Sequence, residues 1–353
     1  MSYLTRASAC STIAGVVTFA ELVEARADDD HPGLLFEDEV WSWREVVAEA
    51  RQRARSIPRG AHVGVLLENV PEFVLWIFGA ALAGGAVVGI NPTRRGAELA
   101  ADIRHTDCAF IVTDSSQAGL LDGLDLAAPI HLTDGNAVSP EGNAVSRLAS
   151  PDPADGSGDP LGAGLGAAGR TEPLLLLFTS GSTGAPKAVV CSQGRLADIG
   201  AYAGTFGIGR DAVTYIAMPL FHGNAIMANL AMATHAGATV ALRRRFSAGG
   251  FLGDIRKFRV TYFNYVGRAL AYILATPEQP DDWDNPLRAA FGTEASARDM
   301  AEFARRFDCA IIEAYGSSEG AISMNKTQET PQDALGLPPD GVDVAIHDQE
   351  TDP

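Results

Sequence analysis

A glycine-rich segment combines four hydroxyl side chains with a lysine, a set of groups suited to binding an anion. It runs Phe178-Thr179-Ser180-Gly181-Ser182-Thr183-Gly184-Ala185-Pro186-Lys187. Apolar residues 174–177 precede it and residues 188–190 follow, which predicts a strand, a loop and a second strand. Because the loop has little side-chain bulk, backbone N–H groups and hydroxyls can converge on an anion, and Lys187 adds a point charge. A polyphosphate is the expected ligand.

The spacing of Gly181 and Lys187 matches a Walker A phosphate loop, but three other features differ from that motif. Pro186 stands where the motif has glycine, and Ala188 stands where it has serine or threonine. A β-type run also follows the lysine, whereas a P-loop NTPase continues into a helix there. The pattern therefore argues against a P-loop NTPase.

A second segment, residues 218–225, places a histidine where a strand gives way to a helix. The strand is expected to end at Pro219 and the helix to begin near His222. A lone histidine at such a position more often makes a structural hydrogen bond than acts as a catalyst. Small residues follow it on the first turns of the helix, and Met227 could form an adaptable wall. Residues 219–222, Pro-Leu-Phe-His, resemble a segment of acyl-CoA synthetases whose helix lines the acyl pocket, and this resemblance implies that His222, Gly223, Asn224, Ala225 and Ala228 bind the acyl group.

A third pair of segments follows two further predicted strands. The first is Gly292-Thr293-Glu294, and the second is Tyr315-Gly316-Ser317-Ser318-Glu319-Gly320. Open α/β sheets bind ligands at the carboxyl ends of their strands, so we expect both loops on the same edge as the phosphate loop. Tyr315 offers a flat surface for a base, Ser318 a hydroxyl and Glu319 a hard oxygen ligand for Mg²⁺.

Strands and helices alternate along most of the chain, which predicts an α/β fold with mainly parallel sheets covered on both faces. We expect an N-terminal αβ subdomain over residues 1–150 and a linker over 151–170. A second αβ subdomain over 171–353 is expected to carry the glycine-rich segment, the segment around His222 and the start of a small β-barrel subdomain. The predicted strands are 34–36, 40–43, 63–67, 87–90, 110–113, 214–218, 239–242, 262–265, 309–313 and 342–347, and the predicted helices are 44–56, 69–80, 97–106, 196–206, 222–235, 248–258 and 297–307.

Residues 151–170 are rich in glycine, alanine, proline and aspartate, and we expect residues 154–169 to be mobile. Residues 164–169 match G-x-G-x-x-G literally, but no strand precedes them and no long helix follows. A dinucleotide site is therefore not expected in this linker.

The composition excludes several classes of function. The formal net charge of −17 and the lack of a basic stripe argue against nucleic-acid binding. Three consecutive arginines, Arg243 to Arg245, are either a solvated strand end or a contact for the phosphates of CoA.

The four cysteines form no Cys-x-x-Cys pair, and Cys191 and Cys309 are expected to be buried packing residues. Residues 19–23 are expected to form an amphipathic helix rather than a secretory signal, no segment has membrane-spanning length, and a cytoplasmic location is expected.

The glycine-rich segment, the segment around His222 and the pair of segments at residues 292–294 and 315–320 occur in an order that resembles one family. This is the adenylate-forming superfamily of acyl-CoA synthetases, peptide-synthetase adenylation domains and luciferases. Residues 68–72 and 89–92 are also similar to family segments, and the segment around His222 most resembles fatty-acyl-CoA synthetases. The resemblance implies ATP, Mg²⁺, CoA and a fatty or other carboxylic acid as ligands, and it implies a role for each candidate residue. The residues that would hold the β- and γ-phosphates are Thr179, Ser180, Gly181, Ser182, Thr183, Gly184 and Lys187. Adenine would contact Gly292, Thr293, Glu294 and Tyr315, and Gly316 and Ser317 would also belong to the ATP site. Ser318 would contact the α-phosphate, Glu319 would ligate Mg²⁺, and His222 would border the acyl and thiol channels.

Two features depart from the family pattern. Ala188 replaces the glycine usual after the loop lysine, and the family continues beyond Pro353 with a ribose-binding aspartate, a hinge and a C-terminal lid carrying a catalytic lysine. The chain is therefore expected to be an amino-terminal part of such an enzyme, with low activity by itself. A fatty acid–CoA ligase is the leading hypothesis. An aryl-acid ligase, a peptide-synthetase adenylation domain and a non-catalytic nucleotide-binding module are the alternatives.

Overall fold

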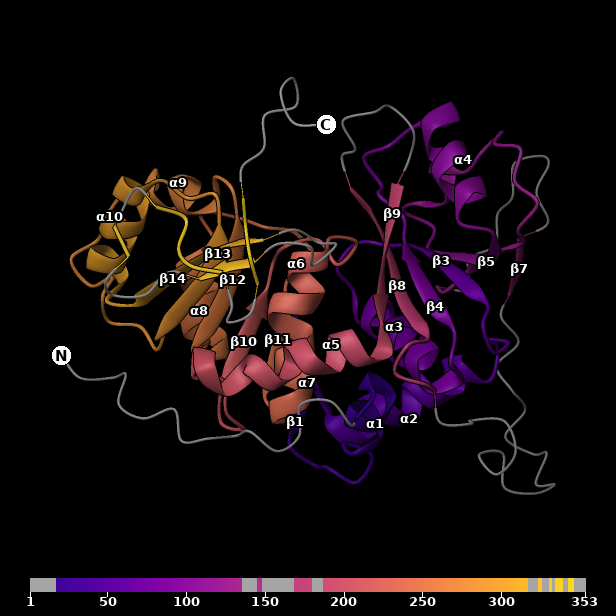
Figure 1. Ribbon diagram of the computed structural model, residues 1–353, viewed down its shortest axis with the longest axis horizontal. Coiled ribbons are helices and arrows are strands. Elements are labelled where there is room, and N and C mark those ends of the chain that lie inside the picture. The colour runs from indigo at the N-terminus through magenta and orange to yellow at the C-terminus, as the bar shows by residue number, and fades with distance from the viewer. Residues whose placement is uncertain are drawn as a thin grey trace.

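The fold consists of two β-sheets that lie side by side and are separated by helices (Figure 1). The computed structural model describes residues 17–134, 145–147, 168–179, 187–316, 323–325, 330–331, 334–338 and 342–345. At residues 145–147, 179, 323 and 325 the description covers only the backbone. The sheets, their covering helices and the elements that carry most of the predicted site lie within these ranges.

The seven-stranded sheet is parallel except at one edge. Its strand order is β7-β6-β5-β3-β4-β8-β9, and only β8 and β9 pair antiparallel. The buried residues of β3, β4 and β8 are apolar or glycine, as in a sheet covered on both faces. The strands are β3 (His62–Leu66), β4 (Ala86–Gly89), β5 (Cys108–Thr113), β6 (Ile130–Leu132), β7 (Val145–Arg147), β8 (Pro173–Thr179) and β9 (Lys187–Ser192).

The eight-stranded sheet has the order β15-β14-β13-β12-β10-β11-β1-β2, with antiparallel pairs only at its two edges. Its inner strands run parallel, so their carboxyl ends share one edge. The strands are β1 (Pro32–Phe36), β2 (Glu39–Ser42), β10 (Val213–Ile216), β11 (Thr239–Leu242), β12 (Tyr262–Val266), β13 (Ala289–Thr293), β14 (Ala310–Gly316) and β15 (Ser323–Asn325).

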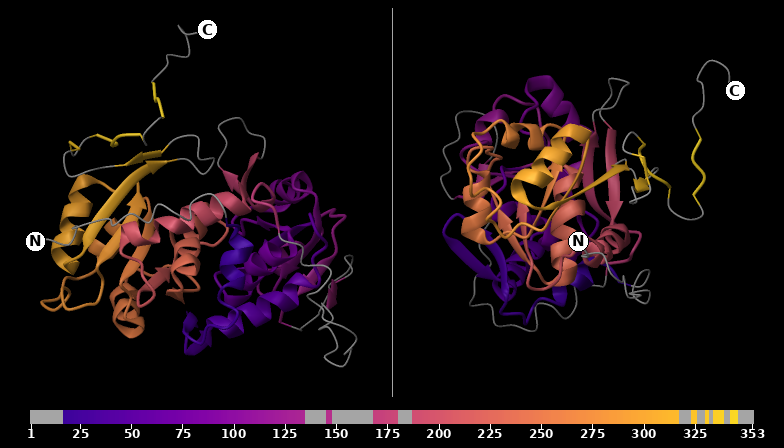
Figure 2. Two further views of the ribbon diagram at one scale, coloured as in Figure 1. Left: turned by 60° about the horizontal axis from the view of Figure 1, so that its bottom comes forward. Right: turned by 90° about the vertical axis from the view of Figure 1, so that its left-hand side faces the viewer.

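Helices fill three layers around these sheets. The largest core cluster joins both sheets through α1 (Phe19–Glu24), α2 (Trp43–Ala54), α3 (Pro71–Ala83), α5 (Gln193–Gly200) and α7 (Ala231–Ala236). A second cluster packs α8 (Phe251–Phe258), α9 (Ala269–Leu274) and α10 (Ala297–Phe307) on the outer face of the eight-stranded sheet, and α4 (Gly96–His105) covers the outer face of the other. Figures 1 and 2 accordingly place α9 and α10 at one end of the molecule and α4 at the other. The layers therefore alternate α-β-α-β-α.

Local sequence signals explain where the central helices begin. Ser42 and Glu45 form a capping box at the start of α2, and Pro71 occupies the first turn of α3, where its missing N–H needs no partner. Gly84 ends α3 in a left-handed conformation with φ of 69°. The α3 helix is buried along most of its length between α2 and the seven-stranded sheet, which accounts for its almost wholly apolar sequence.

The α/β class and the alternation of elements are confirmed, whereas some details differ. The hairpin formed by β1 and β2 and the helices and strands predicted up to residue 113 are present. Strands β6, β7 and β15 and helix α9 were not predicted. The strand predicted over residues 342–347 is wrong for the part described, because residues 342–345 have no strand pairing.

The two sheets do not divide at residues 151–170. Strands β1 and β2 precede that segment but belong to the eight-stranded sheet, and β8 and β9 follow it but belong to the seven-stranded one. The predicted division differs because strand neighbours are set by packing between distant segments, here the parallel pairing of β4 with β8. Most of the predicted mobile linker lies outside the described residues, but Ala168, within its predicted bounds, is buried.

Candidate functional site

The predicted phosphate loop joins the antiparallel strands β8 and β9. Thr179, the last residue of β8, pairs with Lys187, the first residue of β9, so the ends of the loop face each other across the ladder. This confirms the strand-loop-strand prediction. Lys187 is exposed. The remaining predicted phosphate-binding residues, Ser180, Gly181, Ser182, Thr183 and Gly184, lie outside the described residues.

Strands β13 and β14 end at the segments predicted to hold adenine. They are parallel neighbours, with Gly292 opposite Glu313, and Thr293 ends β13. A Cβ added at Gly292 would lie 2.4 Å from the Tyr265 ring, so only glycine fits without movement. Glu294, the first residue after β13, has a φ of 71°, a left-handed conformation that is uncommon for residues other than glycine.

Tyr315 and Gly316 form the end of β14, where Tyr315 is 45% exposed. Ser317, Ser318 and Glu319 lie outside the described residues. The sequence predicted that these loops share an edge with the phosphate loop, and this is wrong in one respect, because β13 and β14 belong to a different sheet from β8. Alternation of strands and helices reveals where each strand ends but not which sheet it joins.

The segment around His222 connects the two sheets. A Cβ at Gly223 would lie 3.2 Å from Leu177 Cδ1, and a Cβ at Gly89 would lie 3.0 Å from Phe221 Cα. Because Leu177 stands two residues before the end of β8, the predicted acyl segment packs directly beside the strand that leads to the phosphate loop. The two glycines permit this close approach of backbone to neighbouring chain.

The His222 side chain packs against the Phe221 ring, with ring centroids 4.5 Å apart. His222 is exposed, but the protein atoms around its imidazole partly desolvate it and lower its pKa. The ring is therefore neutral at pH 7 and can both accept and donate a hydrogen bond. It stands directly before the helix that begins at Gly223.

That helix contains a π-helical turn at residues Ile226–Leu230, between α6 (Gly223–Ala225) and α7. Such turns free a carbonyl from the regular α-helical pattern and occur often at functional sites. Here Tyr262 Oη donates a 2.7 Å hydrogen bond to the Ala228 carbonyl. Ala225 and Ala228 are both buried, so the small residues predicted to leave room for an acyl chain lie within the packed interior.

Three asparagines form a hydrogen-bonded chain, here called the amide relay, between this helix and β12. Asn229 Nδ2 donates to the Tyr215 carbonyl at 3.0 Å and to Asn264 Oδ1 at 2.8 Å. Asn264 Nδ2 in turn donates to Asn224 Oδ1 at 2.5 Å. Sequence reasoning selected Asn224 but missed Asn229 and Asn264, which are buried. The sequence feature that could have identified them is that each is a single asparagine within an otherwise apolar or aromatic run, residues 225–233 and 262–266.

Asn69 joins the two sheets through backbone hydrogen bonds. Its Nδ2 donates to the carbonyls of Met218 at 2.9 Å and Arg243 at 3.2 Å, and its Oδ1 accepts from the Leu220 amide at 2.8 Å. Asn69 follows β3, whereas its partners follow β10 and β11. This buried side chain therefore fixes the loop that precedes His222.

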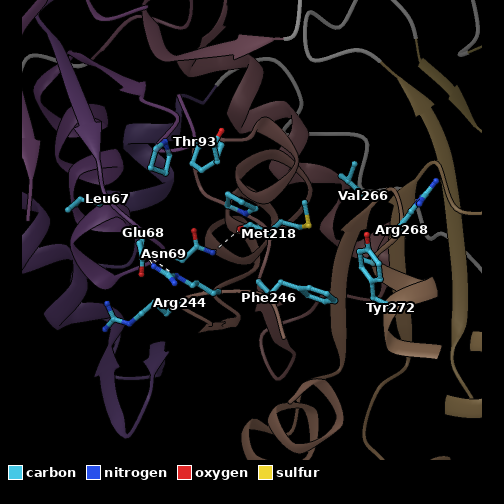
Figure 3. Close-up of a pocket in the computed structure, with 16 residues that line it drawn as sticks. Leu67, Glu68, Asn69, Thr93, Met218, Arg244, Phe246, Val266, Arg268 and Tyr272 are labelled. Carbon is cyan, nitrogen blue, oxygen red and sulfur yellow. Dashed lines mark hydrogen bonds and ion pairs between the residues drawn. The ribbon is translucent and has the colours of Figure 1, made fainter. Parts of the chain in front are cut away.

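A cavity of about 380 Å³ opens at the carboxyl ends of strands from both sheets (Figure 3). Figure 3 shows Glu68 and Asn69 on one side of it and Arg268 and Tyr272 on the other. Its wall is mainly apolar, although charged and polar side chains also line it. The lining residues are Leu67, Glu68, Asn69, Pro92, Thr93, Ala217, Met218, Pro219, Phe221, Arg244, Arg245, Phe246, Val266, Arg268, Ala269 and Tyr272.

The arginine cluster, Arg243 to Arg245, is paired with carboxylates of the protein. Arg243 lies 3.1 Å from Asp254, Arg244 lies 3.1 Å from Glu37, and Arg245 pairs with Glu68, which also lines the cavity. Because the three arginines already pair with carboxylates, the structure argues against the alternative that this cluster binds the phosphates of CoA. Arg268 is exposed at the rim, and its guanidinium has no hydrogen-bond or ion-pair partner in the described part of the chain.

The described cysteines fit a packing role. Cys191 and Cys309 are buried as predicted, and desolvation raises the pKa of the Cys191 thiol to about 11 and that of Cys309 to about 12. Both thiols are therefore protonated and weakly nucleophilic at pH 7. Within the ranges described, no group of three or more His, Cys, Asp or Glu side chains could hold a metal ion. The helices of these ranges include none with the length and apolar character needed to span a bilayer.

A family model described as AMP-binding enzyme matches residues 22–353. The chain belongs to the AMP-binding enzyme family. Curated relatives of this AMP-binding chain include steroid-22-oyl-CoA synthetase from Rhodococcus jostii, which is 51% identical over 344 residues, with 95% of this chain and 60% of the relative covered. Medium/long-chain-fatty-acid–CoA ligase FadD17 from Mycobacterium tuberculosis is 40% identical over 341 residues, with 94% and 64% covered.

Solved structures share the fold of the AMP-binding chain. The anthranilate CoA ligase AuaEII in complex with anthranoyl-AMP has a TM-score of 0.77 at 20% identity, with 95% of this chain and 67% of that chain covered. A benzoate CoA ligase from Burkholderia xenovorans has a TM-score of 0.75 at 17% identity, with 92% and 66% covered. The chain spans about 60–64% of the length of the curated relatives named above.

Proposed function

We propose that this chain supplies the ATP- and acyl-binding part of an AMP-forming fatty acid–CoA ligase. One observation carries the proposal: the β8–β9 hairpin, with Lys187 opposite Thr179, packs through Leu177 against Gly223 of the His222 segment. The strand that leads to the proposed phosphate loop is thereby adjacent to the proposed acyl segment, although that segment follows a strand of the other sheet. Family membership and the relatives that act as acyl-CoA ligases support the same reaction.

The reaction has two steps. A carboxylate oxygen attacks the α-phosphorus of ATP and pyrophosphate leaves; the CoA thiolate then attacks the acyl carbon and AMP leaves. Because both nucleophiles are anions attacking substrates that carry negative charge, catalysis needs neutralisation and alignment more than an acid or base. Lys187 and the loop from Thr179 to Gly184 would hold the β- and γ-phosphates, and Ser318 the α-phosphate. Residues 292–294 with Tyr315 would hold adenine, and Glu319 would ligate Mg²⁺.

The cavity fits the thiol substrate. Met218 and Phe221, which precede His222, line the cavity. The residues that follow His222 pack elsewhere, with Gly223 against Leu177 and Asn224 against Asn264. CoA has a slender arm and an anionic head, which suits an apolar channel whose rim carries Arg268, a residue without a partner among those the structure describes. His222 stands between these two faces, at the point where the thiolate would meet the acyl-adenylate. The acyl substrate would be a medium- or long-chain acid or a steroid side-chain acid, as for the relatives.

The test is ATP–pyrophosphate exchange and acyl-CoA formation by the full-length protein with a panel of carboxylic acids. Lys187→Ala should weaken ATP binding by about 1.5–3 kcal/mol, since it removes a charged phosphate contact. Glu319→Ala should weaken use of Mg-ATP while sparing metal-free nucleotide binding. Neither change should lower the melting temperature much without ligand, because both sites follow polar loop positions. Wild-type exchange rates in both variants would contradict the assignments.

A further inference from the structure

The amide relay has a fixed direction, because it begins at a backbone carbonyl. The Tyr215 carbonyl can only accept, so the amide of Asn229 must turn its Nδ2 toward it. Asn229 Oδ1 has no partner among the described residues. The opposite orientation would place an amide oxygen against the Tyr215 carbonyl oxygen. The relay therefore keeps its direction even though one buried oxygen stays unpaired.

This direction passes to the next two side chains. Asn229 Nδ2 also meets Asn264, so Asn264 must present Oδ1 there and turn its own Nδ2 toward Asn224. Asn264 Nδ2 lies 2.5 Å from Asn224 Oδ1 and 3.4 Å from the Asn224 carbonyl, two acceptors. The Asn224 oxygen is thereby occupied, and its Nδ2 must point away from the relay.

Asn224 Nδ2 has no protein partner in the described part of the chain, and Asn224 is half-buried beside Gly223 in the first turn after His222. The residues that follow it in the helix, Ala225, Ile226 and Ala228, are apolar and buried. An amide donor held here without freedom to turn loses hydrogen bonding to water when a hydrocarbon chain covers it. A ligand oxygen within reach would restore that bond.

We propose that Asn224 is a specificity-determining residue that donates from Nδ2 to an oxygen carried by the acyl group of the substrate. The substrate class is then an oxygen-substituted carboxylic acid, with a hydroxyl or oxo group on the chain or ring, in preference to a plain hydrocarbon acid. This inference rests on the proposed ligase function. A site built to hydrogen-bond a substrate oxygen rejects the analogue that lacks it, because the buried donor is left unpaired.

The experiment compares kcat/KM of the full-length enzyme for decanoic acid and for its 3-, 5- and 7-hydroxy and 3-oxo derivatives. We expect kcat/KM for at least one oxygenated acid to exceed that for decanoic acid by about 10- to 100-fold, and Asn224→Leu to bring this ratio down to about 1. Gln52→Leu, which removes an exposed amide of α2 outside the acyl segment, is the matched control and should keep the wild-type ratio.

Each outcome can be told apart from failure of the ligase function. Equal kcat/KM for plain and oxygenated acids in the wild type would overturn the inference and leave the ligase function standing. An equal loss for all acids in Asn224→Leu would also overturn it, since the donor would then serve the carboxylate or the fold. If Asn224→Leu does not fold, as judged by circular dichroism, the wild-type ratio still decides. Absence of thioester with every acid tested would instead contradict the proposed function.

Discussion

The two sheets bury different kinds of side chain. In the seven-stranded sheet the buried residues of β3, β4 and β8 are apolar or glycine. In the eight-stranded sheet, β10 and β12 bury Tyr215, Tyr262, Asn264 and Tyr265. Several of these make directed hydrogen bonds: Tyr215 Oη donates to Asp254 at 2.8 Å, and Tyr262 Oη donates to the Ala228 carbonyl.

This difference gives the two sheets different roles: one stabilises the elements of the site, and the other orients them. Apolar burial is not directional, so the first sheet can stabilise the phosphate hairpin without dictating the orientation of any one group. Buried hydrogen bonds specify orientation, and a group left unpaired costs free energy. The second sheet therefore controls how the helix after His222 sits. Asn69 links the two sheets, with its side chain bonded to loops that follow β10 and β11.

The largest effect is expected at this link. Asn69→Leu removes the partners of two carbonyls and one amide, and each buried backbone group left unpaired costs about 1–3 kcal/mol. Urea denaturation measures the change in the free energy of unfolding. Gln52→Leu, an amide replaced on the exposed face of α2, is the control and should stay near wild type. Similar stability of the two variants would show that Asn69 does not join the sheets energetically.

In the seven-stranded sheet, truncation of an apolar side chain should matter most. Leu175 in β8 is fully buried, so Leu175→Ala is expected to lower the free energy of unfolding by about 2–5 kcal/mol through lost burial and a cavity. Leu337→Ala makes the same chemical change at a residue that is 65% exposed, and it should have little effect. Equal midpoints in thermal denaturation would refute apolar support as the role of β8.

In the eight-stranded sheet, the turn after β13 depends on a close contact. Gly292→Ala places a Cβ 2.4 Å from the Tyr265 ring and should cost about 1–3 kcal/mol by overpacking. Adding Tyr265→Leu should recover part of the loss by making room. If the double variant is no more stable than the sum of the single changes predicts, the ring contact is not the cause.

Two tyrosines of β12 give the smallest but most specific comparison. Tyr262→Phe leaves the Ala228 carbonyl without its donor and should cost about 1–3 kcal/mol. Tyr265→Phe removes a buried hydroxyl that has no hydrogen-bond partner among the described residues, so it should be neutral or stabilising. Guanidinium denaturation of both variants measures the difference. If the two variants lost the same free energy of unfolding, the hydrogen bond of Tyr262 would not be what distinguishes the two faces of β12.

The sequence by itself determined the α/β class, most elements and the strand-loop-strand frame of the phosphate segment. These follow from local signals: the apolar runs of β3, β4 and β8, the capping box at Ser42 and the proline at the start of α3. Such signals act within a few residues, so they can be recognised along one chain.

Only the tertiary structure decided which segments meet. It assigned β8 to one sheet and β13 with β14 to the other, and it aligned three asparagines that lie up to 40 residues apart in sequence, as Asn224 and Asn264 do. The physical reason is that sheet membership and buried hydrogen bonds depend on long-range packing. Apolar periodicity reveals that a strand is buried, but it does not identify the strand or helix that will cover it.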